Sequence, residues 1–231
     1  MRQVYSVNPA QSQSLGQNIE THKVLRQTYS LLAMTLLVSA IAAFVGMVVG
    51  LPHGISLVLS LGAMGILWFV LPKVANSSKG ILVVFAVAAM LGAGLAPTLS
   101  YYLASANGGM IVMQALGGTA LVFFGLSGYV LTTRKDFSFM GGFLMVGLLT
   151  VVVASLAFVV AGFFGFHMPA INLALSAVVV LLMSGFILYD TSAIIHGGET
   201  NYIMATVRLY LDILNLFTAL LHILGALNSD D

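Results

Sequence analysis

The chain has 231 residues, of which 60% are hydrophobic and only 6% are charged, and its formal net charge at pH 7 is +1. Soluble domains usually carry about 25% charged residues, so a soluble fold of this composition would expose large apolar patches to water. The absence of cysteine excludes disulfides and thiolate chemistry, and the near-zero net charge gives no sign of nucleic-acid binding. The composition therefore predicts a protein whose main partner is the lipid bilayer.

Apolar stretches follow one another along the chain at lengths that suit membrane helices. A bilayer core about 30 Å thick requires roughly 20 apolar residues per helix. We therefore predict an all-α polytopic membrane protein with a polar N-terminal tail at 1–27, a transmembrane domain at 28–227 and a short C-terminal tail at 228–231. The seven predicted transmembrane helices are 28–50, 54–74, 80–103, 110–132, 139–164, 169–193 and 206–227.

The basic residues predict the orientation of these helices. They lie in the N-terminal tail, in the connection between the second and third helices, in the connection between the fourth and fifth, and at the start of the last helix. Cytoplasmic loops carry an excess of Lys and Arg, so the N-terminus is expected in the cytoplasm and the C-terminus on the opposite, periplasmic side. The eight residues are Arg2, Lys23, Arg26, Lys73, Lys79, Arg134, Lys135 and Arg208.

Two carboxylates lie inside predicted membrane helices. Asp190 falls near the end of the sixth helix and Asp212 early in the seventh, whereas the other five acidic residues lie in tails or loops. The two helices form an antiparallel hairpin with its apex near Asn201, and each aspartate is 11 residues from that apex. Equal spacing predicts equal depth in the membrane, and intramembrane carboxylates mark candidate functional sites.

Two facing carboxyl groups in a low dielectric are expected to share one proton and to titrate in two separate steps. Asp190 and Asp212 would then form a proton-sensitive gate, because a change in their protonation alters the packing of the hairpin. When ionised, the same two groups are a candidate site for Ca²⁺, which prefers oxygen ligands.

A structural alternative gives these aspartates no gating role. Arg208 precedes Asp212 by four residues, a spacing at which the two side chains can pair along one helix face. Asp212 would then be a neutralised structural residue, with Asp190 hydrogen-bonded to backbone or tyrosine. His196 and Glu199 flank the connection near the aspartates, where they either tune the pair or belong to a solvated loop.

Enzymatic function is not expected, and no cofactor is expected either. The last predicted helix contains no lysine for a retinal Schiff base, and the second aspartate lies in LYLD rather than in the GxGD motif of intramembrane aspartyl proteases. No phosphate-binding loop, HExxH zinc motif or GxSxG nucleophile motif is present. The sequence therefore assigns no catalytic residues.

The stretches ILYDTSAII and RLYLDILNLFTALLHILGALNSDD resemble the signature region of the transmembrane Bax-inhibitor family. Within that family, THKVLRQTYSLL, ALGGTALVFFGLSGYVLTTRKDFSFMGG, SGFILYD and IIHGGETNYIMATV are similar to a bacterial inner-membrane subgroup that modulates the FtsH protease. The resemblance covers essentially the whole chain. It implies that the seventh helix is central, wrapped by the other six, and that Asp190 and Asp212 form a dyad on the cytoplasmic side.

The resemblance also implies two functions. One is a pH-sensitive Ca²⁺ or other cation leak of the bacterial inner membrane, gated by Asp190 and Asp212. The alternative is modulation of the membrane-anchored AAA metalloprotease FtsH, with the N-terminal tail as a handle. Channel-type relatives carry an arginine at the end of the second helix that pairs with the dyad. This chain has FVLPKV there, where Lys73 is a candidate to tune the dyad, and Arg208 beside Asp212 would have to take the place of that arginine.

Overall fold

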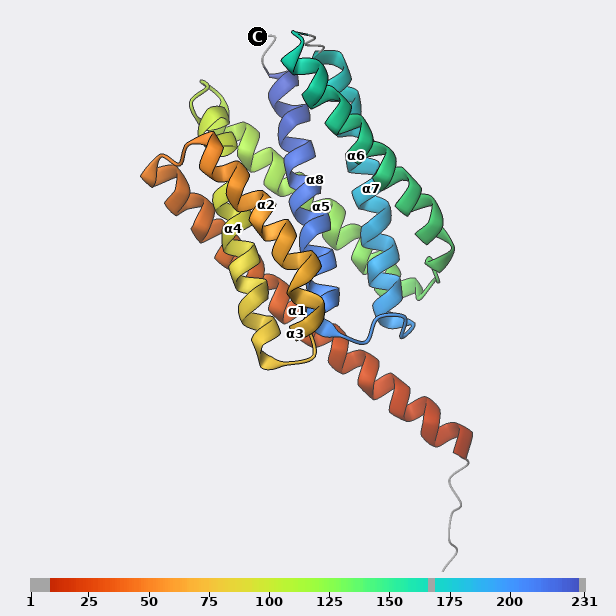
Figure 1. Ribbon diagram of the computed structural model, residues 1–231. Coiled ribbons are helices and arrows are strands. Elements are labelled where there is room, and N and C mark those ends of the chain that lie inside the picture. The colour runs from red at the N-terminus through yellow and green to blue at the C-terminus, as the bar shows by residue number, and fades with distance from the viewer. Residues whose placement is uncertain (1–8, 166–168, 229–231) are drawn as a thin grey trace, which may run out of the picture.

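The computed structural model describes residues 9–165 and 169–228, and these residues contain helices but no strand (Figure 1). Residues 1–8 of the predicted tail, which include Arg2, and residues 229–231 lie outside the described part of the chain. The helices are α1 (Pro9–Val49), α2 (His53–Phe69), α3 (Leu71–Val74), α4 (Ser78–Leu103), α5 (Gly108–Thr133), the short 3-10 helix η1 (Ser138–Met140), α6 (Gly141–Phe163), α7 (Pro169–Ile195) and α8 (Tyr202–Leu227).

Within the described residues, six stretches of helix are long and apolar enough to cross a membrane, and they match six of the seven predicted helices in order. The remaining prediction, 54–74, is divided in two by the structure. Helix α2 has 17 residues and ends at Phe69, and the four-residue helix α3 follows with Pro72 in its first turn. Proline has no N–H and its ring clashes with the preceding turn, so Pro72 favours a new helix start at this point over one continuous helix.

Helix α1 is longer than the sequence predicts. It begins at Pro9, within the segment expected to be a polar tail, and continues without a break to Val49. Its candidate membrane-crossing part is Glu20–Val49. Figure 1 shows that the N-terminal part of α1 projects well beyond the other helices. The polar segment is therefore a helical extension of the first membrane helix, as far as it is described.

Among the described membrane-crossing stretches, that of α8 is the most buried. Half of its apolar stretch is buried inside the protein, against 11% for α6. It packs against α1, α4, α5 and α7, whereas in the described residues α2 packs on α3 and α4 and α6 packs on α7 and η1. Leu209, Leu216 and Leu221 of α8 are fully buried, and the hydroxyl of Tyr210 is 2.9 Å from Ser39 Oγ of α1. The α7–α8 hairpin is therefore held in place by neighbours on several sides.

The chain segments that carry the basic residues gather at one end of the bundle. Figure 1 shows the α3–α4, α5–α6 and α7–α8 connections at the same end, which is also the end from which α1 projects. The C-terminus of α8 lies at the opposite end, together with the α4–α5 connection. The antiparallel packing thus places the predicted cytoplasmic loops on a single side.

Candidate functional site

The structure brings the two intramembrane aspartates together. Asp190 lies near the end of α7 and Asp212 in the third turn of α8, and both are buried, with 5% and 6% of their surface exposed. Their carboxyl groups interact as hydrogen-bond partners. An ionised carboxylate can only accept a hydrogen bond, so this contact requires a proton on one of the two groups. We call Asp190 and Asp212 the carboxyl pair.

One oxygen of the pair has no donor. Within the described residues, Asp212 Oδ2 is buried, and no N–H or O–H group donates a hydrogen bond to it. A buried carboxylate oxygen without a donor destabilises the ionised form of that carboxyl group. The geometry therefore favours a state in which Asp212 holds the shared proton and Asp190 accepts it.

Arg208 connects the pair to the loop above it. Its guanidinium lies 3.8 Å from Asp190 Oδ1 and 3.2 Å from Glu199 Oε2. In the part of the chain that the structure describes, it forms no ion pair with Asp212, although the two residues are four positions apart on α8. The Arg208 side chain is 44% exposed, while that of Glu199 is 14% exposed. Arg208 of α8 thus bridges two acidic residues, Asp190 and Glu199, neither of which lies in α8.

The α7–α8 connection is fixed in a way that positions Glu199. The side chain of Asn201 caps α8 by accepting hydrogen bonds from the N–H groups of Ile203 and Met204. The Asn201 N–H donates to Glu199 Oε1 at 2.9 Å, and Asn201 Nδ2 donates to Asn76 Oδ1 at 2.7 Å. Glu199 therefore binds both Asn201 and Arg208, and the same connection is tied to the turn between α3 and α4.

His196 and Lys73, the other residues that the sequence suggests could tune the pair, lie elsewhere. His196 is exposed, and its Nε2 donates to the Arg134 carbonyl at 3.1 Å, so it ties the α7–α8 connection to the α5–α6 connection. Nearby, the N–H of Ser138 donates to Asp136, and this bond holds the pKa of Asp136 below its ordinary value. Lys73 is exposed and forms no ion pair within the described residues.

The site does not fit a resident metal ion. Among the described residues, no group of three His, Cys, Asp or Glu side chains is arranged to hold one. Ca²⁺ takes six to eight oxygen ligands, and the buried part of this site offers two carboxyl groups with a guanidinium beside them. A cation at the carboxyl pair would therefore be a passing ion rather than a bound cofactor.

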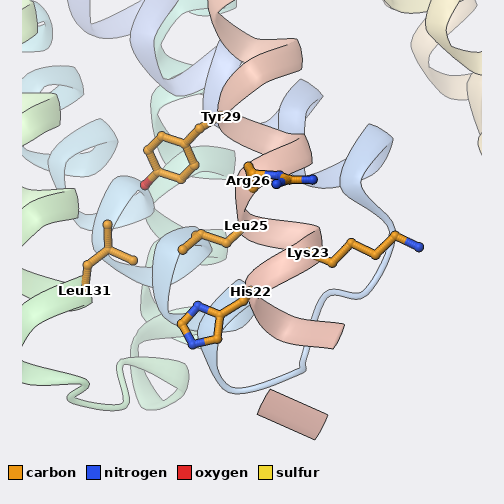
Figure 2. Close-up of a pocket in the computed structure, with 6 residues that line it drawn as sticks. All are labelled: His22, Lys23, Leu25, Arg26, Tyr29 and Leu131. Carbon is orange, nitrogen blue, oxygen red and sulfur yellow. The ribbon is translucent and has the colours of Figure 1, made fainter. Parts of the chain in front are cut away.

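A cavity of about 570 Å³ lies beside the start of the membrane-crossing part of α1. Figure 2 shows His22, Leu25 and Tyr29 pointing toward Leu131 of α5, whereas Lys23 and Arg26 point away from it. The Tyr29 hydroxyl is hydrogen-bonded to Ser127, so the polar group at the inner end is already paired. The cavity is therefore mainly an apolar gap, and its two permanently charged neighbours do not face into it.

The chain is similar to a set of bacterial membrane proteins along nearly its whole length. The family described as "Inhibitor of apoptosis-promoting Bax1" matches residues 21–229. A Vibrio cholerae relative described as "Uncharacterized membrane protein" is 50% identical over 218 residues, which cover 94% of this chain and 96% of the relative. The Escherichia coli K12 relative "Modulator of FtsH protease YccA" is 51% identical over 212 residues, which cover 92% of this chain and 94% of the relative. A relative from another E. coli strain carries the name "Inner membrane protein YccA" with the same identity and coverage.

Proposed function

Because the chain belongs to the membrane-protein family described as inhibitors of apoptosis-promoting Bax1, we propose that it modulates a membrane-anchored AAA metalloprotease of the FtsH type in the bacterial inner membrane. The observation that carries this proposal is the 51% identity to the E. coli FtsH modulator over 92% of the chain. At this similarity the two proteins share their membrane helices and the connections between them, which are the surfaces available to a protease in the same bilayer.

The proposed topology has seven membrane crossings with a cytoplasmic N-terminus. Its support is the gathering of the basic connections at one end of the bundle together with the positive-inside rule. Helix α2 makes the shortest crossing, because 17 helical residues span about 25 Å. In this topology α8 is the central crossing, and the projecting part of α1 extends into the cytoplasm as a handle for the partner.

Purification of the tagged full chain from membranes in mild detergent is expected to recover FtsH. A variant without residues 1–19 retains the whole membrane-crossing part of α1, which begins at Glu20, and is expected to recover severalfold less protease because it lacks the projecting helix. An unrelated polytopic membrane protein with the same tag serves as the control. Failure of the full chain to recover more protease than this control would contradict the proposal.

The carboxyl pair supports a second function, a pH-sensitive leak for Ca²⁺ or another cation. The specific observation is the ordered chain of charges from Glu199 through Arg208 to Asp190, with Asp212 beyond it. In this state the pair holds one proton, and the remaining negative charge on Asp190 attracts Arg208. A second proton, taken up by Asp190 in acid, cancels that attraction and frees Arg208 to leave the site. Acidification is therefore the condition that opens the leak.

Cation flux into proteoliposomes tests this second function. The wild-type flux is expected to rise as the pH falls. Asp190→Asn is expected to raise the flux at neutral pH severalfold and to abolish the response to acid, because the amide, like the protonated carboxyl group, carries no negative charge to hold Arg208. Asp212→Asn is expected to keep the wild-type flux at neutral pH, because an amide can donate to Asp190 as the protonated Asp212 does. Identical flux and pH response in all three proteins would remove the idea.

A further inference from the structure

A cavity in the described part of the chain lies in the opposite half of the bundle from the carboxyl pair. It measures about 870 Å³ and is lined by the end of α4, the second half of α6, the first half of α7 and the second half of α8. Figure 1 shows these four helix segments at the end of the bundle where the C-terminus lies. The volume is within the range of about 300–1,000 Å³ that is typical of ligand sites.

Polar residues of α8 form a stripe that leads from this cavity toward the carboxyl pair. Asp212 is followed by Asn215, Thr218 and His222 at intervals of three, three and four residues, which place them on one helix face. The last three line the cavity, whereas Asp212 does not. Asn215 is one turn, about 5 Å, from Asp212. The cavity therefore ends close to the pair without reaching it.

The hydrogen bonds of the lining side chains leave oxygen atoms available to the cavity. The hydroxyls of Thr218 and Ser176 donate to the carbonyls of Leu214 and Asn172 in their own helices. Asn215 Nδ2 likewise donates to the Leu211 carbonyl at 2.8 Å. With these protons engaged, the lone pairs of the two hydroxyls and of Asn215 Oδ1 remain available to an occupant, together with the second N–H of Asn215.

The charge of the cavity is compatible with a cation. Among the described residues, no Lys, Arg, Asp or Glu lines it, and His222 is the only imidazole in its wall. Oxygen acceptors without a permanent positive charge suit water and hydrated hard cations. An acyl chain would leave these acceptors in an apolar environment, which destabilises them unless they are hydrated.

We propose that this cavity is a water-filled vestibule that admits a hydrated cation from the side of the membrane where the C-terminus lies. The proposal deepens the second function, because it supplies the approach to the carboxyl pair on which that function rests. The vestibule is closed off from Asp212 in this structure, so an ion that enters it must wait there until the hairpin rearranges. Water access can be measured without any flux, and so the two ideas can fail separately.

The chain contains no cysteine, so single cysteines can be introduced and labelled without a background. Ser155→Cys places a thiol in the cavity wall of α6, and Val153→Cys places one two residues away on a side chain that is 65% exposed and does not line the cavity. Both variants are reconstituted in vesicles and treated with a cationic trimethylammonium-ethyl methanethiosulfonate and with its anionic sulfonatoethyl counterpart.

Ser155→Cys is expected to react with the cationic reagent at least about tenfold faster than Val153→Cys. It is also expected to favour the cationic over the anionic reagent about tenfold, once each rate is divided by the rate of the same reagent with a small free thiol. Asn215→Cys in α8 is expected to behave as Ser155→Cys does. Equal rates at positions 153 and 155 would overturn the vestibule, because lipid would then fill the cavity. Equal normalised rates with the two reagents would overturn the preference for cations. Fast cationic labelling together with absence of cation flux would leave the vestibule standing and reject the leak.

Discussion

Replacement of Gly92 by alanine is expected to lower the thermal stability of the detergent-solubilised protein by several degrees. A Cβ atom at this position of α4 would collide with the backbone of Ser39 in α1, lying 2.8 Å from both the carbonyl carbon and the Cα. A backbone cannot rotate away as a side chain can, so α1 and α4 would have to separate. Overpacking of this kind destabilises by about 1–3 kcal/mol, which corresponds to roughly 3–10 °C for a chain of this size.

The separation would also reach the α7–α8 hairpin, because Ser39 Oγ is bonded to the buried hydroxyl of Tyr210 in α8. Gly125 is the matched control, since a Cβ there would have no neighbour within 4 Å. Gly125→Ala is expected to leave the melting temperature unchanged or to raise it, because alanine favours a helix interior by about 1 kcal/mol over glycine. Equal melting temperatures for the two variants in a thermal-shift assay would show that α1 and α4 do not pack closely at Gly92.

The membrane helices could be predicted because the solvent imposes their length. Each apolar stretch has to satisfy its own backbone within the bilayer, and the predicted ends of α4 and α5 are within two residues of those observed. Helix boundaries are predicted less well where the local side-chain chemistry outweighs the length of the apolar stretch. Pro72 divides one predicted helix in two, and the polar residues before Tyr29 continue α1 although they lack the apolar pattern by which a membrane helix is recognised.

The sequence predicts that the two members of the carboxyl pair lie at the same depth in the membrane, but it does not predict which groups bind them. The symmetric spacing of Asp190 and Asp212 around Asn201 depends only on the rise of two antiparallel helices. The partner of Arg208 depends on side-chain directions and on the path of the connection. Glu199 is held by the Asn201 N–H beside the start of α8. Arg208 therefore extends toward Glu199 and Asp190 rather than along its own helix to Asp212.

The spacing of polar residues along α8 is a sign of the polar cavity that the sequence contains, although no single residue reveals it. His222 alone suggests a packed side chain or one that reaches the interface. The spacing of Asp212, Asn215, Thr218 and His222 defines a polar face on an otherwise apolar helix. Sequence spacing cannot show what faces that stripe, because the opposite wall comes from α4, α6 and α7. Only the arrangement of these helices turns a polar stripe into a cavity.

Arg208→Gln is expected to raise the cation flux at neutral pH by roughly tenfold. The variant removes the positive charge that holds Asp190 and Glu199 together and leaves three acidic groups at the site without a base. Loss of one partner of a fully buried ion pair destabilises by about 3–5 kcal/mol, and the 44% exposure of the Arg208 side chain reduces this to about 1–2 kcal/mol through solvent screening. A shift of about 1.4 kcal/mol changes a closed-to-open equilibrium tenfold.

Lys73→Gln is the control for Arg208→Gln, because it removes the same charge from the same end of the bundle at a position without an ion pair in the described residues. It is expected to leave the flux and its pH response as in the wild type. Arg208→Lys provides a graded comparison, since lysine keeps the charge but cannot form the two-pronged contacts of a guanidinium, and its flux is expected between those of the wild type and Arg208→Gln. If Lys73→Gln and Arg208→Gln raised the flux equally, the effect would come from the overall charge of the cytoplasmic end, and Arg208 would hold no specific position over the carboxyl pair.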